Sequence, residues 1–198
     1  MDSKKVTSAA PTHTECAALV RAAAAGDEAS LDRLLLRAQQ VARRFSRSVC
    51  GQTGDADDAV QEALIKTYRN VGHIRDPEAF RPWLYRTVRN ACLVGRRRRA
   101  GEPAHMQPLD DVRPPHPGRT PEQLAAGADW RRQLRRAMRV LPGQYREVLF
   151  LRDIEGLSTR EVARVTGITE DNVKTRLRRA RTQLKAALAG NSSHPPAH

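Results

Sequence analysis

The sequence predicts an all-α protein built from two small helical domains. Apolar residues recur at helical spacing on both sides of a proline-rich stretch, and no alternating pattern long enough for a β-strand competes with them. Aromatic residues make up only 4% of the 198 residues, which argues against one large core. Residues 101–121 contain six prolines, a composition that disfavours packing and predicts a linker. We therefore expect helical domains at 15–100 and 122–188, the linker at 101–121, and disordered tails at 1–14 and 189–198.

Three helices are predicted in the first domain from their apolar stripes. One follows the break at Gly26-Asp27, a second begins near Asp55, and a third follows Asp76-Pro77. The side chains expected to be buried are Leu31, Leu34, Leu35, Ala38, Val41, Ala42, Phe45 and Val49 on the first helix, Val60, Leu64, Tyr68 and Val71 on the second, and Phe80, Leu84, Val88 and Ala91 on the third.

The charge balance indicates a polyanionic partner. The formal net charge is +13, with basic residues in excess in both halves, and such a balance favours nucleic acid. No run of 18 apolar residues and no apolar signal core is present, so we expect a cytoplasmic protein that does not insert into a membrane. Cys16, Cys50 and Cys92 are far apart and lack metal-ligand spacing, so we expect reduced, mostly buried thiols and no zinc site.

Acidic residues gather at the start of the second predicted helix. Asp58 and Glu62 stand at i and i+4, away from the apolar stripe, with Asp57 and Gln61 beside them. One interpretation is a solvated helix start, with Glu62 and Lys66 as a compensating pair. The other is a docking face for a basic partner.

The third predicted helix interleaves aromatic and basic residues. Trp83, Arg86, Asn90 and Arg97 fall on one flank, and Tyr85 and Arg89 on the other. Rings that stack on bases, beside guanidinium groups that hold phosphates, are typical of single-stranded nucleic-acid binding. The alternative is that Trp83 and Tyr85 complete the core.

A helix-turn-helix is predicted in the second domain. "LSTREVARVTGITEDNVKTRLRRA" begins with a capping box of Ser158 and Glu161, turns at Gly167 and caps a second helix at Thr169. On that second helix Val173, Leu177, Ala180 and Leu184 share the inner face, which leaves a basic face for the major groove of DNA.

Two segments resemble bacterial RNA polymerase sigma factors. "GDADDAVQEALIKTYRNVGHIRDPEAFRPWLYRTVRNACLVGRRRR" (54–99) is similar to their region 2, and "LPGQYREVLFLRDIEGLSTREVARVTGITEDNVKTRLRRAR" (141–181) to their region 4. With both motifs in order and no further domain, residues 15–188 resemble the two-domain extracytoplasmic-function class. The resemblance implies a factor that directs core RNA polymerase to promoters, contacts its β′ clamp helices and β flap, and binds double- and single-stranded promoter DNA. It also implies an anti-sigma factor as a partner.

The resemblance assigns residues by position. "DDAVQE" is similar to the segment that docks on the clamp helices, although Ala59 stands where Leu is usual, and the loop 70–76 precedes the segment that holds the unwound −10 element. The expected polymerase contacts are Asp57, Asp58, Gln61 and Glu62. The expected −10 contacts are Asn70, His73, Arg75, Trp83, Arg86, Arg89, Asn90 and Arg97. The expected −35 contacts are Lys174, Thr175, Arg176, Arg178, Arg179 and Arg181, of which Arg176 and Arg181 are assigned to phosphates.

Two other classes of function compete with this one. A stand-alone helix-turn-helix regulator would bind an operator, but it needs neither the acidic "DDAVQE" face nor the aromatic and basic helix. An enzyme acting on nucleic acid needs a carboxylate cluster for metals, which the third helix lacks. The sequence therefore predicts no catalytic residue, metal or cofactor.

Overall fold

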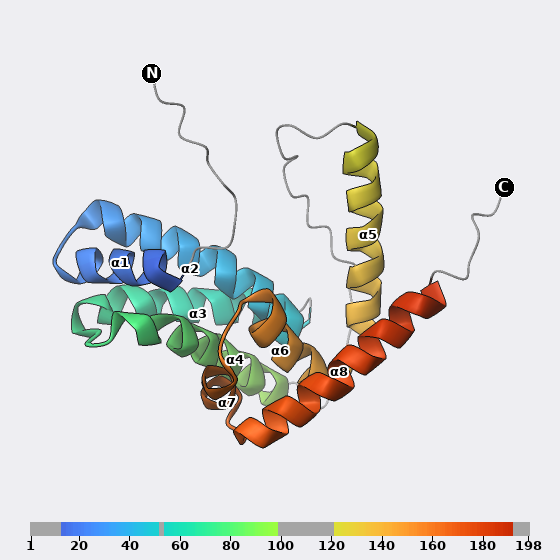
Figure 1. Cartoon of the computed structure of the whole chain (residues 1–198). Helices are drawn as coiled ribbons and strands as arrows, with labels where there is room; N and C mark the ends of the chain where they lie inside the picture. The colour runs from blue at the N-terminus through green and yellow to red at the C-terminus, as the bar shows by residue number, and fades with distance from the viewer. Residues whose placement is uncertain (1–12, 52–53, 99–120, 192–198) are drawn as a thin grey trace. The chain divides into compact units, whose positions relative to one another are not determined.

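The chain folds as two separate helical units. The computed structural model describes residues 13–51, 54–98 and 121–191, and every regular element in these ranges is helical (Figure 1). One unit lies within residues 1–104 and the other within 105–198. The prediction of an all-α fold in two small domains is confirmed. The predicted linker lies outside the described residues except for Pro121, which begins a helix.

In the part of the chain that the structure describes, the first unit is a bundle of four α-helices. Two short 3-10 turns, η1 (Val71–His73) and η2 (Pro77–Ala79), join its last two helices. Helices α2, α3 and α4 pack against one another, and α1 packs against α2 (Figure 1). The four helices are α1 (His13–Ala24), α2 (Glu28–Val49), α3 (Gly54–Asn70) and α4 (Phe80–Arg98).

Helix α1 is not among the helices predicted from the sequence. It begins two residues inside the expected N-terminal tail. Its buried residues follow helical spacing: Cys16, Ala17, Val20 and Ala23. Small side chains there let α1 lie close to α2, and the weak apolar signal of alanine explains why the helix was missed.

The core of the first unit is centred on α2 and α4. Phe45 and Tyr85 are both fully buried and meet edge to face, with ring centroids 5.1 Å apart. Tyr85 therefore completes the core, as one of the two interpretations of the sequence expected, and its ring cannot stack on a base. Leu34, Leu84 and Val88 are buried as predicted.

Tyr68 was expected in the core, and this prediction is wrong. Its side chain is 63% exposed, whereas Thr67 is buried and donates a hydrogen bond from its hydroxyl to the Ala63 carbonyl at 2.8 Å. Steps of four residues advance 400° around a helix, so the series 60, 64, 68 drifts off the buried face by about 40° a step. The buried face of α3 instead passes through Val60, Ala63 and Thr67.

The expectation of three reduced thiols is wrong for two of the cysteines. Cys50, which follows α2, and Cys92 in α4 are joined as a disulfide, with their Cα atoms 5.4 Å apart. Cys16 is free and buried. The bonded cysteines are separated by 42 residues, so no local spacing indicates the pair; the packing of α4 against α2 brings them together.

The second unit contains the predicted helix-turn-helix. Ser158 and Glu161 form the capping box, Gly167 adopts a left-handed conformation at φ +70°, and the Asn172 amide donates to the Thr169 hydroxyl at 3.3 Å. A left-handed residue favours glycine, which explains the turn at that position. The elements of the unit are α5 (Pro121–Val140), α6 (Gly143–Leu149), the π-helix η3 (Phe150–Ile154), α7 (Thr159–Thr166) and α8 (Glu170–Asn191).

Helix α8 is anchored along one face. Val173, Leu177 and Ala180 are buried, and the half-buried Leu184 packs with Leu141 and Leu149 of the same unit. The predicted inner face is confirmed. The helix ends at Asn191, so it continues three residues into the expected C-terminal tail.

Candidate functional site

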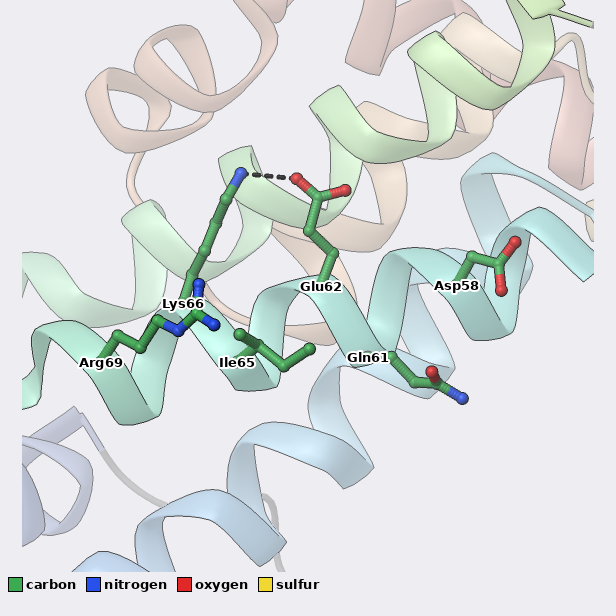
Figure 2. Close-up of a pocket in the computed structure, with 6 residues that line it drawn as sticks. All are labelled: Asp58, Gln61, Glu62, Ile65, Lys66 and Arg69. Carbon is green, nitrogen blue, oxygen red and sulfur yellow. Dashed lines mark hydrogen bonds and ion pairs between the residues drawn. The ribbon is translucent and has the colours of Figure 1, made fainter.

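A surface with acidic residues at one end and basic residues at the other runs along α3. Asp58, Gln61 and Glu62 line a shallow hollow of about 370 Å³, together with three residues further along the helix, Ile65, Lys66 and Arg69 (Figure 2). We call these six residues the α3 face. They recur every three or four positions, so they share one side of the helix. Asp57 is exposed but does not line this hollow.

Glu62 already has a partner within the helix. Lys66 Nζ lies 2.5 Å from Glu62 Oε1, and both side chains are about half exposed (Figure 2). Exposed i,i+4 pairs contribute only about 0.3–0.5 kcal/mol. The compensating pair that the sequence suggested is therefore present, yet it is weak enough for a basic partner to displace.

A second hollow lies between the end of α3 and the start of α4. We call it the loop hollow; its volume is about 510 Å³, within the usual range for ligand pockets. Trp83 is half-buried there, and its ring lies 5.8 Å from that of Phe80, tilted by 31°. The Asn70 amide donates to the Lys66 carbonyl at 2.8 Å. The lining residues are Lys66, Asn70, His73, Ile74, Asp76, Ala79, Phe80 and Trp83.

The loop hollow gathers some of the predicted −10 contacts and not others. Asn70, His73 and Trp83 line it, although they come from α3, η1 and α4. The remaining predicted contacts lie outside its lining: Arg75, Arg86, Asn90 and Arg97 are exposed, and Arg89 is half-buried.

The outward side of α8 carries the predicted −35 contacts. Lys174, Thr175, Arg178 and Arg179 are exposed, whereas Arg176 is half-buried. We call these five residues the α8 face. Lys174 Nζ lies 3.0 Å from Asp171 Oδ1, and this hydrogen bond raises the pKa of the lysine.

Arg181 has a structural partner. Its guanidinium donates to both carboxylate oxygens of Asp153, at 2.9 Å and 2.6 Å, which ties α8 to η3 and raises the pKa of the arginine. A phosphate that meets Arg181 must share it with this carboxylate.

Several surface residues were missed by the sequence analysis. Arg160 and Arg164, both exposed on α7, line an open hollow of about 680 Å³ with Asn172 at the start of α8. Their i,i+4 spacing on the first helix of the helix-turn-helix is a signal that could have identified them. Helical spacing of three or four residues, counted from Asp58, would likewise have placed Ile65 and Arg69 on the α3 face.

The described residues offer neither a metal cluster nor a membrane span. No group of three or more His, Cys, Asp and Glu side chains in these ranges is placed to hold a metal ion. None of the helices in the same ranges is both long and apolar enough to cross a bilayer.

Known proteins match both units. The chain fits the family models "Sigma-70 region 2" over residues 33–102 and "Sigma-70, region 4" over residues 131–184. It is 36% identical over 172 residues to the ECF RNA polymerase sigma factor SigM of Mycobacterium tuberculosis, covering 87% of this chain and 84% of that protein. It is 32% identical over 180 residues to the ECF RNA polymerase sigma-E factor of Escherichia coli K12, covering 84% and 90%.

Solved structures agree with the fold. CnrH, solved in complex with the cytosolic domain of CnrY, has a TM-score of 0.59 at 26% identity, covering 88% of this chain and 97% of that chain. The sigma factor RpoE of Bartonella quintana, solved with the anti-sigma factor NepR, has a TM-score of 0.62 at 22% identity, covering 80% and 96%, and supports the fold alone. From the two matched regions and the level of identity, the chain belongs to the sigma-70 family, as an extracytoplasmic-function (ECF) RNA polymerase sigma factor.

Proposed function

We propose that this sigma factor binds core RNA polymerase through the α3 face and directs it to promoters with two separate DNA-binding surfaces. The observation that carries the proposal is the pair of exposed acids at the N-terminal end of the α3 face, Asp58 and Glu62, because they stand on a protein with a net charge of +13. Acids repel DNA, so this face serves a different partner, and a basic coiled coil such as the β′ clamp helices complements it. The exposed Asp57 extends the same charge toward the start of α3.

Region 2, assigned to residues 15–100, holds the melted −10 element. The loop hollow accepts an unpaired base, which Trp83 stacks on or braces, while Asn70 and His73 offer polar groups to its edge. The exposed basic and amide side chains outside the hollow follow the strand backbone: Arg75, Arg86, Arg89, Asn90 and Arg97.

Region 4, assigned to residues 122–188, reads the −35 element as duplex. Helix α8 is fixed by its buried side, so the α8 face enters the major groove, where arginine and lysine donate to guanine. Arg160 and Arg164 on α7 contact phosphates beside the groove, as the first helix of such a motif crosses the backbone. Residues 101–121 link the regions and span the polymerase between them.

No chemistry is assigned to the chain itself. Sigma factors are not a class of enzymes, and we infer that this one acts in the cytoplasm without a catalytic residue or cofactor, as a subunit of the polymerase. Region 4 also contacts the β flap. CnrH, 26% identical to this chain, was solved in complex with the cytosolic domain of CnrY, which supports a further protein partner, and we infer that this partner is an anti-sigma factor.

The proposal is tested by reversing the charge of the two acids on the α3 face. Asp58→Lys combined with Glu62→Lys turns attraction into repulsion, and a like-charge contact costs several kcal/mol, so binding to core polymerase should fall by about 100-fold or more. Both side chains are exposed, so the fold should survive. Affinity for fluorescently labelled core enzyme and promoter-specific transcripts are measured together.

A matched control separates the face from the overall charge. Glu15→Lys combined with Glu28→Lys adds the same charge at exposed positions on α1 and α2. This variant should bind core polymerase as the wild type does. If both double variants lose binding equally, the α3 face is not the docking site; if the wild type itself does not bind core enzyme, the chain acts as a stand-alone DNA-binding regulator.

A further inference from the structure

Two cysteines meet where α2 ends and α4 passes. Cys50 caps the C-terminus of α2, Cys92 lies on α4, and the bond between them closes a loop of 42 residues that contains all of α3. A Cα separation of 5.4 Å is ordinary for a disulfide, so the backbone holds the two thiols in bonding position. The binding surfaces proposed for polymerase and DNA do not use this pair.

The two bonded cysteines differ in exposure. Cys50 is half-buried, so a small oxidant or a dithiol can approach it, while Cys92 is only 1% exposed. The third thiol, Cys16, is buried in α1, and burial raises its pKa, which keeps it in the unreactive protonated form. Cys50 is therefore the thiol that an oxidant reaches first, and the buried Cys92 is the thiol that forms the disulfide with it.

The bond lies at a tightly packed junction of three helices. Cys50 Sγ lies 4.0 Å from the Asp55 carbonyl oxygen in the first turn of α3. On α4, Gly95 lies so close to Asp55 that a Cβ atom at that position would stand 2.5 Å from the Asp55 carboxyl carbon. A cross-link here ties α4 to the C-terminal end of α2, beside the first turn of α3.

We propose that Cys50 and Cys92 are a reversible redox-modification site, oxidised by a hydroperoxide and reduced by a dithiol, that sets the stability of region 2. A sigma factor works among cellular dithiols that keep thiols reduced, so a half-exposed disulfide is labile and forms only when an oxidant is present. This part of the argument rests on the proposed function. The structure shows the oxidised state.

The chemistry balances with one hydroperoxide. The Cys50 thiolate attacks one peroxide oxygen, the O–O bond breaks, and the products with hydrogen peroxide are a sulfenic acid and, after proton uptake, water. The Cys92 thiol then attacks the Cys50 sulfur, the S–O bond breaks, and the hydroxide leaves with the thiol proton as a second water. The two sulfurs lose two electrons in total, and a dithiol returns them by thiol–disulfide exchange while becoming a disulfide itself.

The site is tested on the full chain by counting thiols and measuring unfolding. The chain is first reduced with dithiothreitol, then treated with hydrogen peroxide, and the peroxide is removed. The remaining free thiols are then labelled with a maleimide polymer under denaturing conditions and counted. The wild type should fall from three thiols to one, Cys50→Ala should keep two, and the matched control Cys16→Ala should fall from two to none. Reduction of the folded, oxidised chain by dithiothreitol or a thioredoxin should restore all three in the wild type.

Stability is the second measurement. Closing a loop of 42 residues restricts the unfolded chain, so an unfolding midpoint of the oxidised wild type should lie about 10 °C or more above that of the reduced form. Cys16→Ala should show the same difference, and Cys50→Ala none. After a heat challenge between the two midpoints, only the oxidised protein should still support initiation with untreated core polymerase.

The thiol counts and the unfolding midpoints each support or overturn the proposed redox site. Three thiols after oxidation, bonds only between molecules, a disulfide that resists dithiothreitol in the folded chain, or equal midpoints in both states would each overturn the proposal. If the thiol counts and midpoints behave as expected while neither state supports initiation, the redox site stands and the proposed function fails.

Discussion

Arg178 and Arg181 stand three residues apart on α8, and the structure predicts opposite consequences for their removal. Arg178 is exposed on the α8 face, away from the buried Val173 and Leu177. If it donates to a base edge, Arg178→Ala should weaken binding to a cognate −35 duplex by about 1–3 kcal/mol, or about 5- to 150-fold. Binding to a scrambled duplex should change much less, because that site has no matching base to lose.

Arg181→Ala should act mainly on stability. The variant loses two hydrogen bonds to Asp153, at 2.6 Å and 2.9 Å. Because the arginine is 58% and the aspartate 34% exposed, solvent screening limits the loss to about 0.5–1 kcal/mol, which lowers the midpoint of a domain this size by a few degrees. If Arg181 also touches a phosphate, its removal weakens binding to the cognate and the scrambled duplex in the same ratio.

Fluorescence anisotropy of the full chain on both duplexes, at several salt concentrations, separates the two roles. The cognate duplex is first selected from a random pool by the wild type. Removing a side chain that binds a phosphate should reduce the slope of log affinity against log salt by about 0.9, whereas removing one that binds only a base should leave the slope unchanged. Equal losses on the two duplexes for Arg178→Ala would remove it from base reading. Asp153→Ala should match the stability loss of Arg181→Ala, and additive losses in the double variant would show that the two side chains do not interact.

Three further predictions concern single side chains. Trp83→Ala should reduce transcription from a fully duplex promoter more than from one with a pre-opened bubble, because Trp83 lines the loop hollow; equal losses would assign it to the core. Ser158→Ala should cost about 1 kcal/mol in thermal unfolding, because it removes the cap that accepts from the Glu161 amide at 3.2 Å, and an unchanged midpoint would contradict this. The hydrogen bond from the Ser30 hydroxyl lowers the pKa of Asp27 in the folded protein below its ordinary value of 3.8. The ionised Asp27 therefore stabilises the fold above pH 3.8, and this stabilisation is lost as the pH falls through the folded pKa. The stability advantage over Asp27→Asn should therefore shrink below about pH 4, and a constant advantage would refute the assignment.

The features that the sequence predicted best are those coded within one or two turns of helix. The capping box at Ser158 and the turn at Gly167 each depend on residues at most four apart, and the structure has both as expected. The buried side of α8 was predictable for the same reason, since Val173, Leu177 and Ala180 share one face by spacing alone.

The errors arise where distant segments meet. Whether Cys50 reaches Cys92 depends on how α4 crosses α2. The contact of Arg181 with Asp153, which the sequence did not predict, likewise depends on where η3 lies against α8, and the phosphate contact of Arg181 stays a prediction. Neither can be computed from periodicity. The burial of Tyr68 was predicted wrongly for a local reason: steps of four residues over about two turns of helix move a residue off the buried stripe, which repeats every 3.6 residues.

Lys66 lies between the two sites proposed in region 2, the α3 face and the loop hollow. No sequence motif indicates this position; it follows from the structure. The lysine belongs to the α3 face and also lines the loop hollow, and its ammonium is held by Glu62 on the α3 side. A basic partner that binds Glu62 competes with Lys66 for this carboxylate, of which Lys66 contacts Oε1. If the loop hollow captures a strand as proposed, an ammonium released from Glu62 would stand at the edge of the hollow, within reach of the phosphates of that strand. Polymerase docking and strand binding would then favour each other through one side chain, and coupling of this kind is reciprocal.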